Sequence, residues 1–324
     1  MGKSVIEQRL LEYPDVFADV YNGFYFGGIT VLSEESLEAM PGSAYTRDME
    51  GEVRGRMRDV RKKCRISGGD YQVICQVENQ TDIDNTMPVR VMGYEYAAYE
   101  EQIDQIRDEN KKNKRDAGSR KLFASQKLTP VMSLVLYFGE GRWRKPKRLH
   151  DMLRWPENVP ERVRQYVPDY PIKVIEVAHL REEERRCLKS DFRIVAEYLA
   201  CHGNMEKWEE FLKGNHPIRH VEALLDVLGE LMRDDLYYEL LDSIREKKRT
   251  EEEWNMCKIA QELHRRGMEE GMEQGMQVSM QIMKAIRENI RAGQERNFAL
   301  ESISARFEIS EETAGQYYDL VAGN

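Results

Sequence analysis

The sequence predicts an α/β protein in which a mixed sheet flanked by helices is followed by an all-helical C-terminal region. Stretches typical of strands occur at about 54–66, 71–79, 128–138 and 172–178, and they stop near residue 181. Helical periodicity surrounds these stretches and continues alone from residue 183. The order helix, hairpin, helix, strand and strand fits an α/β sandwich built around a mixed sheet.

The first elements follow from proline and glycine positions. Residues 4–25 are predicted to be helical with a break at Pro14, and Gly23, Gly27 and Gly28 end the helix. Residues 29–52 are expected to be irregular. The strands at 54–66 and 71–79 then form a hairpin turned on Gly68-Gly69, because glycine tolerates the positive φ of tight turns. A helix follows from Pro88, since proline fits the first turn, and runs to about residue 110.

Two further strands complete the predicted sheet. Leu128–Phe138 is a continuous apolar run typical of a strand buried on both faces, and Ile172–Ala178 is a shorter one. The connection between them, residues 139–170, contains Trp143, Trp155 and several prolines. A connection of that length is expected to be functional or packed down.

The domain prediction has four parts: a core at 1–180, a helical domain at 181–250, a long charged helix at 251–296 and a small helical tail at 297–324. In the long helix, Gly267, Gly271 and Gly275 are each followed by methionine. This pattern indicates either a self-association helix, giving a homodimer, or a semi-flexible linker. Two short helices end the chain, the second starting at Ser310. They are interpreted as a helical tail, in preference to a helix-turn-helix DNA reader.

Composition narrows the class of protein. Five scattered cysteines without a Cys-x-x-Cys pair favour reduced thiols over a disulfide framework or a zinc site. No segment approaches 18 apolar residues and the N-terminus has no apolar leader, so we expect a cytoplasmic protein without membrane contact. Motifs typical of nucleotide-binding loops and of helical zinc proteases do not occur.

The net charge of −9 conceals basic stretches. Residues 107–148 hold 13 Lys or Arg against 4 Asp or Glu, and a second basic run covers residues 54–65. A basic face on an acidic protein suits phosphate binding, because the local field attracts a polyanion. The alternative is an ordinary solvated surface.

The hairpin brings two carboxylates together. A turn on Gly68-Gly69 pairs residues whose numbers add to 137, which places Asp59 opposite Glu78. Their Cβ atoms would be about 5 Å apart. Carboxylates that close repel unless a proton or cation lies between them, and a divalent ion is the favoured interpretation. The alternative is a structural pair neutralised by Arg58 or Arg61.

These features occur in an order similar to one known family. The succession of an Asp, a turn and a Glu-x-Gln motif resembles the PD-(D/E)XK nuclease superfamily. The short sequence motifs around it resemble one branch, the recombination-promoting nuclease / putative transposase family. The matching pieces are Phe17–Asn22, Arg58–Val60, Val77–Thr81, Met87–Arg90, Leu128–Val131, Leu136–Gly139 and the Gly-Met run from Gly267. The resemblance covers about residues 5–180 well and implies a restriction-endonuclease-like core.

The resemblance implies a DNA endonuclease dependent on Mg²⁺ or Mn²⁺, with DNA as its partner. It implies Asp59, Glu78 and the carbonyl of Asn79 as metal ligands, and Asp59, Glu78 and Gln80 as the catalytic set. Most superfamily members carry lysine where this chain has Gln80. A neutral amide can orient water but cannot supply positive charge, so slow or conditional activity is expected.

Four further residues are secondary candidates. Asp19 and Asn22 share one face of the first helix, from which the superfamily often brings an acidic residue to the metal. The alternative for Asp19 is an ordinary exposed helix residue. Arg90 and Tyr94, one turn apart on the helix after Glu78, are expected either to meet phosphate or to support the fold.

Two other functions stay open at this point. In the first, Gln80 marks a decayed site, and the chain is a nucleic-acid-binding scaffold assembled through its C-terminal helices. In the second, the chain is a transposase that joins strands, which requires recognition of DNA ends.

Overall fold

The computed structural model describes residues 3–40, 43–47, 53–57, 60–66, 72–113, 122–214, 216–246 and 254–323. The chain divides into two units, Met1–Cys257 and Lys258–Asn324, and each is described by itself. The finer division into four parts stays a prediction.

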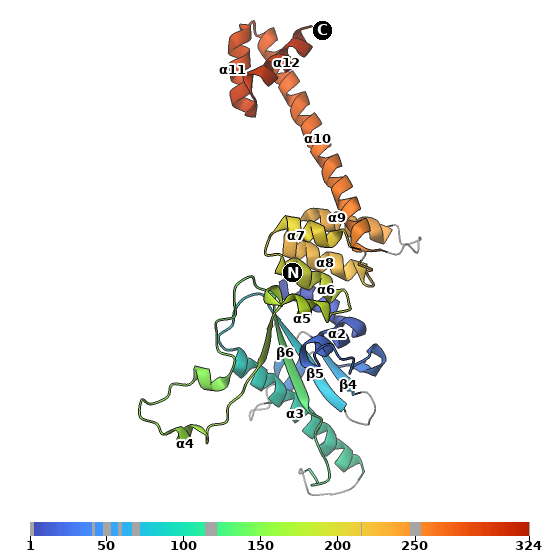
Figure 1. Ribbon diagram of the computed structural model, residues 1–324, viewed down its shortest axis with the longest axis vertical. Coiled ribbons are helices and arrows are strands. Elements are labelled where there is room, and N and C mark those ends of the chain that lie inside the picture. The colour runs from blue at the N-terminus through green and yellow to red at the C-terminus, as the bar shows by residue number, and fades with distance from the viewer. Residues whose placement is uncertain are drawn as a thin grey trace. The chain divides into compact units, whose positions relative to one another are not determined.

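A mixed five-stranded sheet forms the centre of the first unit. In spatial order it contains β1 (Leu37–Ala39), β4 (Val60–Arg65), β5 (Gln72–Gln80), β6 (Val131–Tyr137) and β7 (Lys173–Glu176). β1, β4 and β5 are antiparallel neighbours, whereas β5, β6 and β7 run parallel (Figure 1). The predicted α/β class with a mixed sheet is therefore confirmed.

The register of the hairpin is confirmed. Val60 pairs with Val77 and Arg65 with Gln72, so the paired residue numbers add to 137 throughout β4 and β5. The glycines predicted to turn the hairpin, Gly68 and Gly69, lie outside the described residues, and so does Asp59.

The prediction of one strand over 54–66 is wrong. β3 (Val53–Met57) pairs with β2 (Ser43–Arg47) in a separate two-stranded sheet, so that of the two segments in this range β4, not β3, pairs with β5. The expectation that residues 29–52 are irregular is also wrong, because β1, β2 and the 3₁₀ helix η1 (Glu34–Ser36) lie there. Strands of three to five residues are too short for their periodicity to be read.

Helices cover both faces of the sheet. α1 (Lys3–Glu12) and α2 (Pro14–Tyr25) are separated at the predicted break, and α3 (Met87–Lys112) carries proline in its first turn as predicted. On one face, Tyr21 of α2 donates its hydroxyl to the carbonyl oxygens of Gln76 (2.8 Å) and Met132 (2.9 Å). α3 lies against the opposite face (Figure 1). Both layers are thus joined to the central strands β5 and β6.

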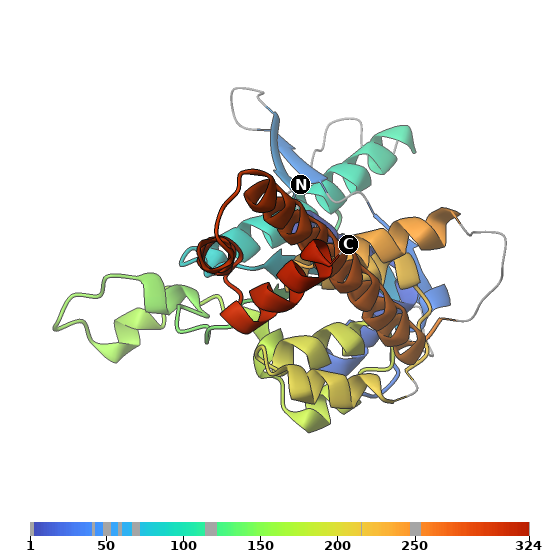
Figure 2. The same ribbon diagram turned by 90° about the horizontal axis from the view of Figure 1, so that it is seen from above.

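A long excursion joins β6 to β7. Residues 139–171, which we call the arm, contain a 3₁₀ helix η2 (Leu149–Met152) and the short helix α4 (Glu161–Arg164). The arm extends away from the sheet in both views (Figures 1 and 2). η3 (Val177–His179) follows β7 directly.

Helices account for the remainder of the first unit, as predicted. They are α5 (Glu182–Arg186), α6 (Phe192–Ala200), α7 (Met205–Leu212), α8 (Val221–Met232) and α9 (Asp235–Glu246). The part of the chain that the structure describes contains no strand after β7.

The second unit is built on the long helix α10 (Met256–Arg291), which begins two residues before the unit does. α11 (Arg296–Phe307) and α12 (Glu311–Ala322) pack on its later half around Ile282, Ile286 and Ile303. Ser310 caps α12 as predicted, accepting a 3.1 Å hydrogen bond from the Thr313 amide. Among the described helices, none combines the length and hydropathy needed to cross a membrane.

Candidate functional site

Glu78 lies on the central strand β5, and its side chain faces α3. Alternation along the strand puts Gln76, Glu78 and Gln80 on that same face. Glu78 is 7% exposed although it is ionisable. A carboxylate that is nearly buried requires hydrogen-bond donors or a cation to offset its loss of hydration.

The compensating donors come from α3 and from β5 itself. Glu78 Oε1 forms an ion pair with Arg90 Nη2 and accepts hydrogen bonds from Gln80 Nε2 (3.2 Å) and the Tyr94 hydroxyl (3.3 Å). Arg90 and Tyr94 lie one turn apart, so the same helix face presents both. The structure therefore brings four predicted site residues together: Glu78, Gln80, Arg90 and Tyr94.

Arg90 is fixed from several sides. Its Nη1 donates to Asp84 Oδ2 at 2.7 Å, and its Nε and Nη2 donate to the Tyr94 hydroxyl at 3.2 and 2.9 Å. Desolvation alone would lower the pKa of Arg90, but hydrogen bonds to Asp84 and Tyr94 outweigh it and raise that pKa. Burial, reinforced by the negative charge of Glu78, raises the pKa of Tyr94. Arg90 is therefore a permanent cation between two carboxylates.

Sequence reasoning missed Asp84. Its Oδ1 accepts hydrogen bonds from the Thr86 amide and hydroxyl, both at 2.7 Å, just before α3 begins. Partial desolvation raises the pKa of Asp84, but hydrogen bonds from Arg90 and Thr86 outweigh it and lower that pKa. An Asp two residues before Thr at a helix start is a local turn signal. That signal could have drawn attention to Asp84, though not to its pairing with Arg90.

The described residues include one arginine that neutralises Glu78. Sequence reasoning considered Arg58 or Arg61. Arg61 instead donates to Glu101 Oε2 of α3 at 2.6 Å, and its side chain is fully buried. Arg58 lies outside the described residues. Within the described residues, Arg90 forms the ion pair with Glu78.

Two oxygens converge on the amide of Gln80. The same nitrogen, Nε2, donates to Glu78 Oε1 at 3.2 Å and to the Asn79 carbonyl oxygen at 2.8 Å. The Phe138 amide donates to the Gln80 carbonyl, so that carbonyl points to β6. Carbonyls alternate along a strand, and the Asn79 carbonyl therefore points toward β4. A carboxylate oxygen and a carbonyl oxygen thus face one shared position.

A buried polar chain lies next to these groups on the α3 face. Gln76 Nε2 donates to Ser133 Oγ, and Ser133 Oγ donates to Glu95 Oε1 at 2.6 Å. The other oxygen of Glu95 accepts a hydrogen bond from the Tyr170 hydroxyl, at the end of the arm. The chain connects the central strands, α3 and the arm.

Asp19 and Asn22 are placed elsewhere. Asp19 Oδ2 accepts hydrogen bonds from the amides of Lys189 and Ser190, both at 2.8 Å, and from Ser190 Oγ at 2.7 Å. Asn22 Oδ1 accepts from the Val31 and Leu32 amides, both at 2.9 Å. The hydrogen bonds and ion pairs of the described residues do not join either of them to Glu78.

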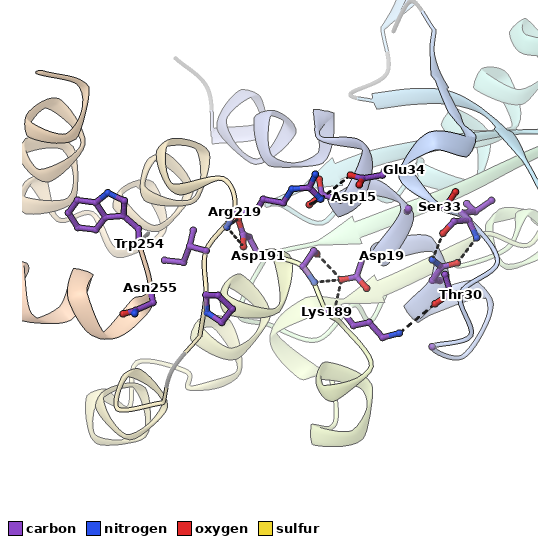
Figure 3. A pocket seen from close by; sticks show the side chains of 17 residues that line it. Asp15, Asp19, Thr30, Ser33, Glu34, Lys189, Asp191, Arg219, Trp254 and Asn255 are labelled. Carbon is purple, nitrogen blue, oxygen red and sulfur yellow. Dashed lines mark hydrogen bonds and ion pairs between the residues drawn. The ribbon is translucent and has the colours of Figure 1, made fainter. Parts of the chain in front are cut away.

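Asp19 and Asn22 instead line a cavity of about 750 Å³ (Figure 3). The figure shows Asp19 beside Lys189 and shows Arg219 between Asp15 and Glu34. Arg219 Nη1 is 3.2 Å from Asp15 and 2.9 Å from Glu34, so both carboxylates are ion-paired. Asp19 thus holds the loop around residue 190 against α2.

Two of the three predicted metal-ligand positions, Glu78 and Asn79, lie among the described residues. No cluster of three His, Cys, Asp or Glu side chains suited to a metal occurs in the described part of the chain. Position 59, predicted to supply the second carboxylate, is outside that part. Glu78 and the Asn79 carbonyl are oxygen donors of the kind that Mg²⁺ and Mn²⁺ accept, and they fit two positions of a ligand set.

Comparison with protein families gave one match. The family described as "Putative transposase, YhgA-like" matches residues 31–202, which is more than half of the chain and spans β1 to α6. Neither the curated proteins nor the solved structures contain a match.

Proposed function

Since the chain belongs to the YhgA-like putative transposase family, whose description indicates a role in DNA recombination or mobility, we propose that it is a metal-dependent DNA endonuclease. The proposal includes a restriction-endonuclease-like core, with Mg²⁺ or Mn²⁺ as cofactor and DNA as substrate. Its catalytic residues would be Asp59, Glu78 and Gln80.

One observation carries the metal proposal. The Gln80 amide nitrogen, a partial positive charge, contacts both Glu78 Oε1 and the Asn79 carbonyl oxygen. A divalent cation prefers such oxygen ligands and would take this shared position after a rotation of the Gln80 side chain. The second carboxylate of the proposal is Asp59, which the sequence predicts and which lies outside the described residues.

Each remaining side chain has a role in the proposed hydrolysis. A bound ion would polarise the scissile phosphate and lower the pKa of a water. Gln80, displaced from Glu78, would orient that water through its amide but, being neutral, would add no positive charge of its own. Arg90 holds Glu78 in place, and its planar guanidinium suits contact with phosphate oxygens. The neutral Gln80 is the reason for proposing a slow enzyme.

The test is nicking of supercoiled plasmid by wild type, Asp59→Ala and Glu78→Gln, with Mg²⁺ or Mn²⁺ and with EDTA. The matched control is Glu206→Gln, which removes an exposed carboxylate of α7, outside the candidate site and the arm. Metal-dependent nicking in wild type and the control, lost in the other two variants, is the expected result. Nicking that survives Glu78→Gln in a folded protein would refute the assignment.

One observation favours a second candidate, a nucleic-acid-binding scaffold with a weak or inactive site. Arg90 neutralises Glu78, so the fold does not depend on a metal ion for charge balance. Calorimetric titration with Mn²⁺ separates the two. A scaffold would show no Mn²⁺ binding that depends on Glu78, whereas the nuclease would lose its Mn²⁺ binding in Glu78→Gln.

A further inference from the structure

We propose that the arm, residues 139–171, holds DNA by its phosphate backbone, with Tyr166 stacking on an exposed base. The proposal rests on the proposed function in taking DNA as the partner. It adds a substrate-binding surface separate from Glu78 and its neighbours.

The arm leaves the sheet beside the candidate site. β6 ends at Tyr137, which pairs with Gln80 on β5, and the Phe138 amide donates to the Gln80 carbonyl at 2.8 Å. The arm therefore starts at the strand ends that carry Gln80. A nucleic acid bound at the site would meet the root of the arm first.

The arm is anchored at both ends. Near its start, the Trp143 amide donates to Glu176 Oε2 at 2.9 Å, and the Trp143 ring packs edge-on against Tyr137. At its end, the Tyr170 hydroxyl donates to Glu95 of α3. These contacts fix the direction in which the arm departs.

The arm also has internal order. Its two limbs are joined where the Leu149 amide donates to the Tyr170 carbonyl (3.1 Å) and the His150 amide donates to Asp169 (2.9 Å). Farther out, the Arg164 guanidinium lies over the Trp155 ring, 5.3 Å from its centre. Figure 2 shows the arm projecting well beyond the helices that cover the sheet. An arm built in this way presents its side chains on a defined scaffold.

Part of the positive charge of the arm serves the fold. Arg142 and Lys147 pair with Glu176, Arg148 with Asp169 and Arg164 with Glu161. A second set has no ion pair among the described residues and is exposed: Arg144, Lys145, Arg154 and Arg162. Overall the arm holds 8 Lys or Arg against 5 Asp or Glu. The second set is therefore available for an anionic partner.

The outer arm also exposes an aromatic ring. Tyr166 is 86% exposed, and its neighbours Val163 and Val167 are 41% and 37% exposed. Leaving apolar surface in water gains nothing for folding. An exposed aromatic ring on the same arm as exposed cations suits nucleic-acid binding, because bases stack on the ring while cations neutralise phosphates. A purely apolar protein partner would not match Arg162 and its charged neighbours.

The first experiment measures DNA binding by fluorescence anisotropy, using a labelled duplex and a labelled single strand in EDTA. The arm variant is Arg144→Gln, Lys145→Gln, Arg154→Gln and Arg162→Gln combined. Each phosphate contact contributes about 0.9 to the slope of log K against log salt on duplex DNA, so losing four contacts should reduce that slope by about 3.6. Affinity should fall at every salt concentration.

A matched control carries the same change of charge elsewhere. It combines Lys207→Gln, Arg233→Gln, Lys284→Gln and Arg287→Gln, four exposed cations of the helical regions that likewise have no ion pair among the described residues. Its salt slope should stay close to that of wild type. An equal change in both variants would mean a general charge effect and would overturn the proposal, as would an unchanged arm variant. Far-ultraviolet circular dichroism verifies that both are folded.

Tyr166 is tested by Tyr166→Ala and Tyr166→Phe with the single strand. Stacking on one base is worth about 1–3 kcal/mol, so the alanine variant should bind roughly 5-fold or more weakly while the phenylalanine variant keeps its affinity. Equal affinity of wild type, Tyr166→Ala and Tyr166→Phe for the single strand would show that Tyr166 does not contact the DNA. Tighter binding of polyglutamate or of RNA than of DNA would overturn DNA as the partner.

Binding in EDTA requires no catalysis, which keeps the two proposals separable. Loss of binding in the arm variant without plasmid nicking by wild type would support the arm and refute the nuclease. Nicking by wild type, together with undiminished DNA binding by the arm variant, would support the nuclease and refute the arm as the DNA-binding surface.

Discussion

Arg90 of α3 and Glu78 of β5 form an ion pair across the boundary between a helix and the central sheet. The other terminal nitrogen of the same guanidinium, Nη1, binds Asp84 Oδ2 at 2.7 Å. One cation therefore balances two carboxylates at the edge of the candidate site. This relationship determines how the site should respond to mutation, metal and pH.

Replacing Arg90 with methionine should destabilise the protein, because two carboxylates lose their counter-ion. Full burial would make this cost 3–5 kcal/mol, but the Arg90 side chain is 35% exposed, and we expect about 2 kcal/mol. Mg²⁺ should restore part of the loss by binding Glu78 in place of the guanidinium. Chemical denaturation with and without Mg²⁺ measures both effects. Equal stability of Arg90→Met and wild type would contradict the ion-pair role.

Replacing Gln80 with lysine should accelerate DNA cleavage. The ammonium would supply the positive charge that the amide lacks, next to the attacking water. The measurement is the single-turnover nicking rate in Mg²⁺, with calorimetry to show that metal binding is retained. A lysine variant that binds metal but cleaves no faster would reject the explanation for slow activity. Gln80→Met controls for loss of the amide alone.

The pH dependence of stability should reveal Asp84. Hydrogen bonds from Arg90 and Thr86 outweigh desolvation and depress the folded-state pKa of Asp84 below the ordinary 3.8. A depressed carboxylate pKa contributes stability above the unfolded-state value and loses it as the pH falls through the folded-state value. Wild type should therefore lose more stability than Asp84→Asn between neutral pH and the acid range. Parallel stability curves for the two proteins would show that Asp84 contributes nothing.

The second unit should mediate self-association through α10. Met268, Met272, Met276 and Met280 are 56–73% exposed, and added Cβ atoms at Gly271 and Gly275 would meet nothing. We expect Met272→Glu with Met276→Glu to reduce a dimer to a monomer, because burying the new charges is costly. Light scattering of the full chain reports the mass, and Met272→Leu with Met276→Leu is the control. A monomeric mass for the wild-type chain would contradict this prediction.

Local signals in the sequence were sufficient for several elements. Pro14 separates α1 from α2, proline lies in the first turn of α3 and Ser310 caps α12, because each acts on the backbone within one turn. The hairpin register followed from the expected turn position, since pairing across an antiparallel ladder changes by one residue on each strand. From that register the sequence also indicated Glu78 as a site residue.

The sequence by itself thus determined the α/β class, the helical C-terminal region and the β4–β5 register. Only the tertiary structure decided which partners meet across elements. It separated β3 from β4, assigned Arg61 to Glu101 and Arg90 to Glu78, and placed Asp19 against the Ser190 loop. The physical reason is the separation along the chain between the residues that interact. Turns, caps and ladders act between neighbours in the chain, whereas a buried charge takes whichever donor the packing of distant segments brings within hydrogen-bond distance.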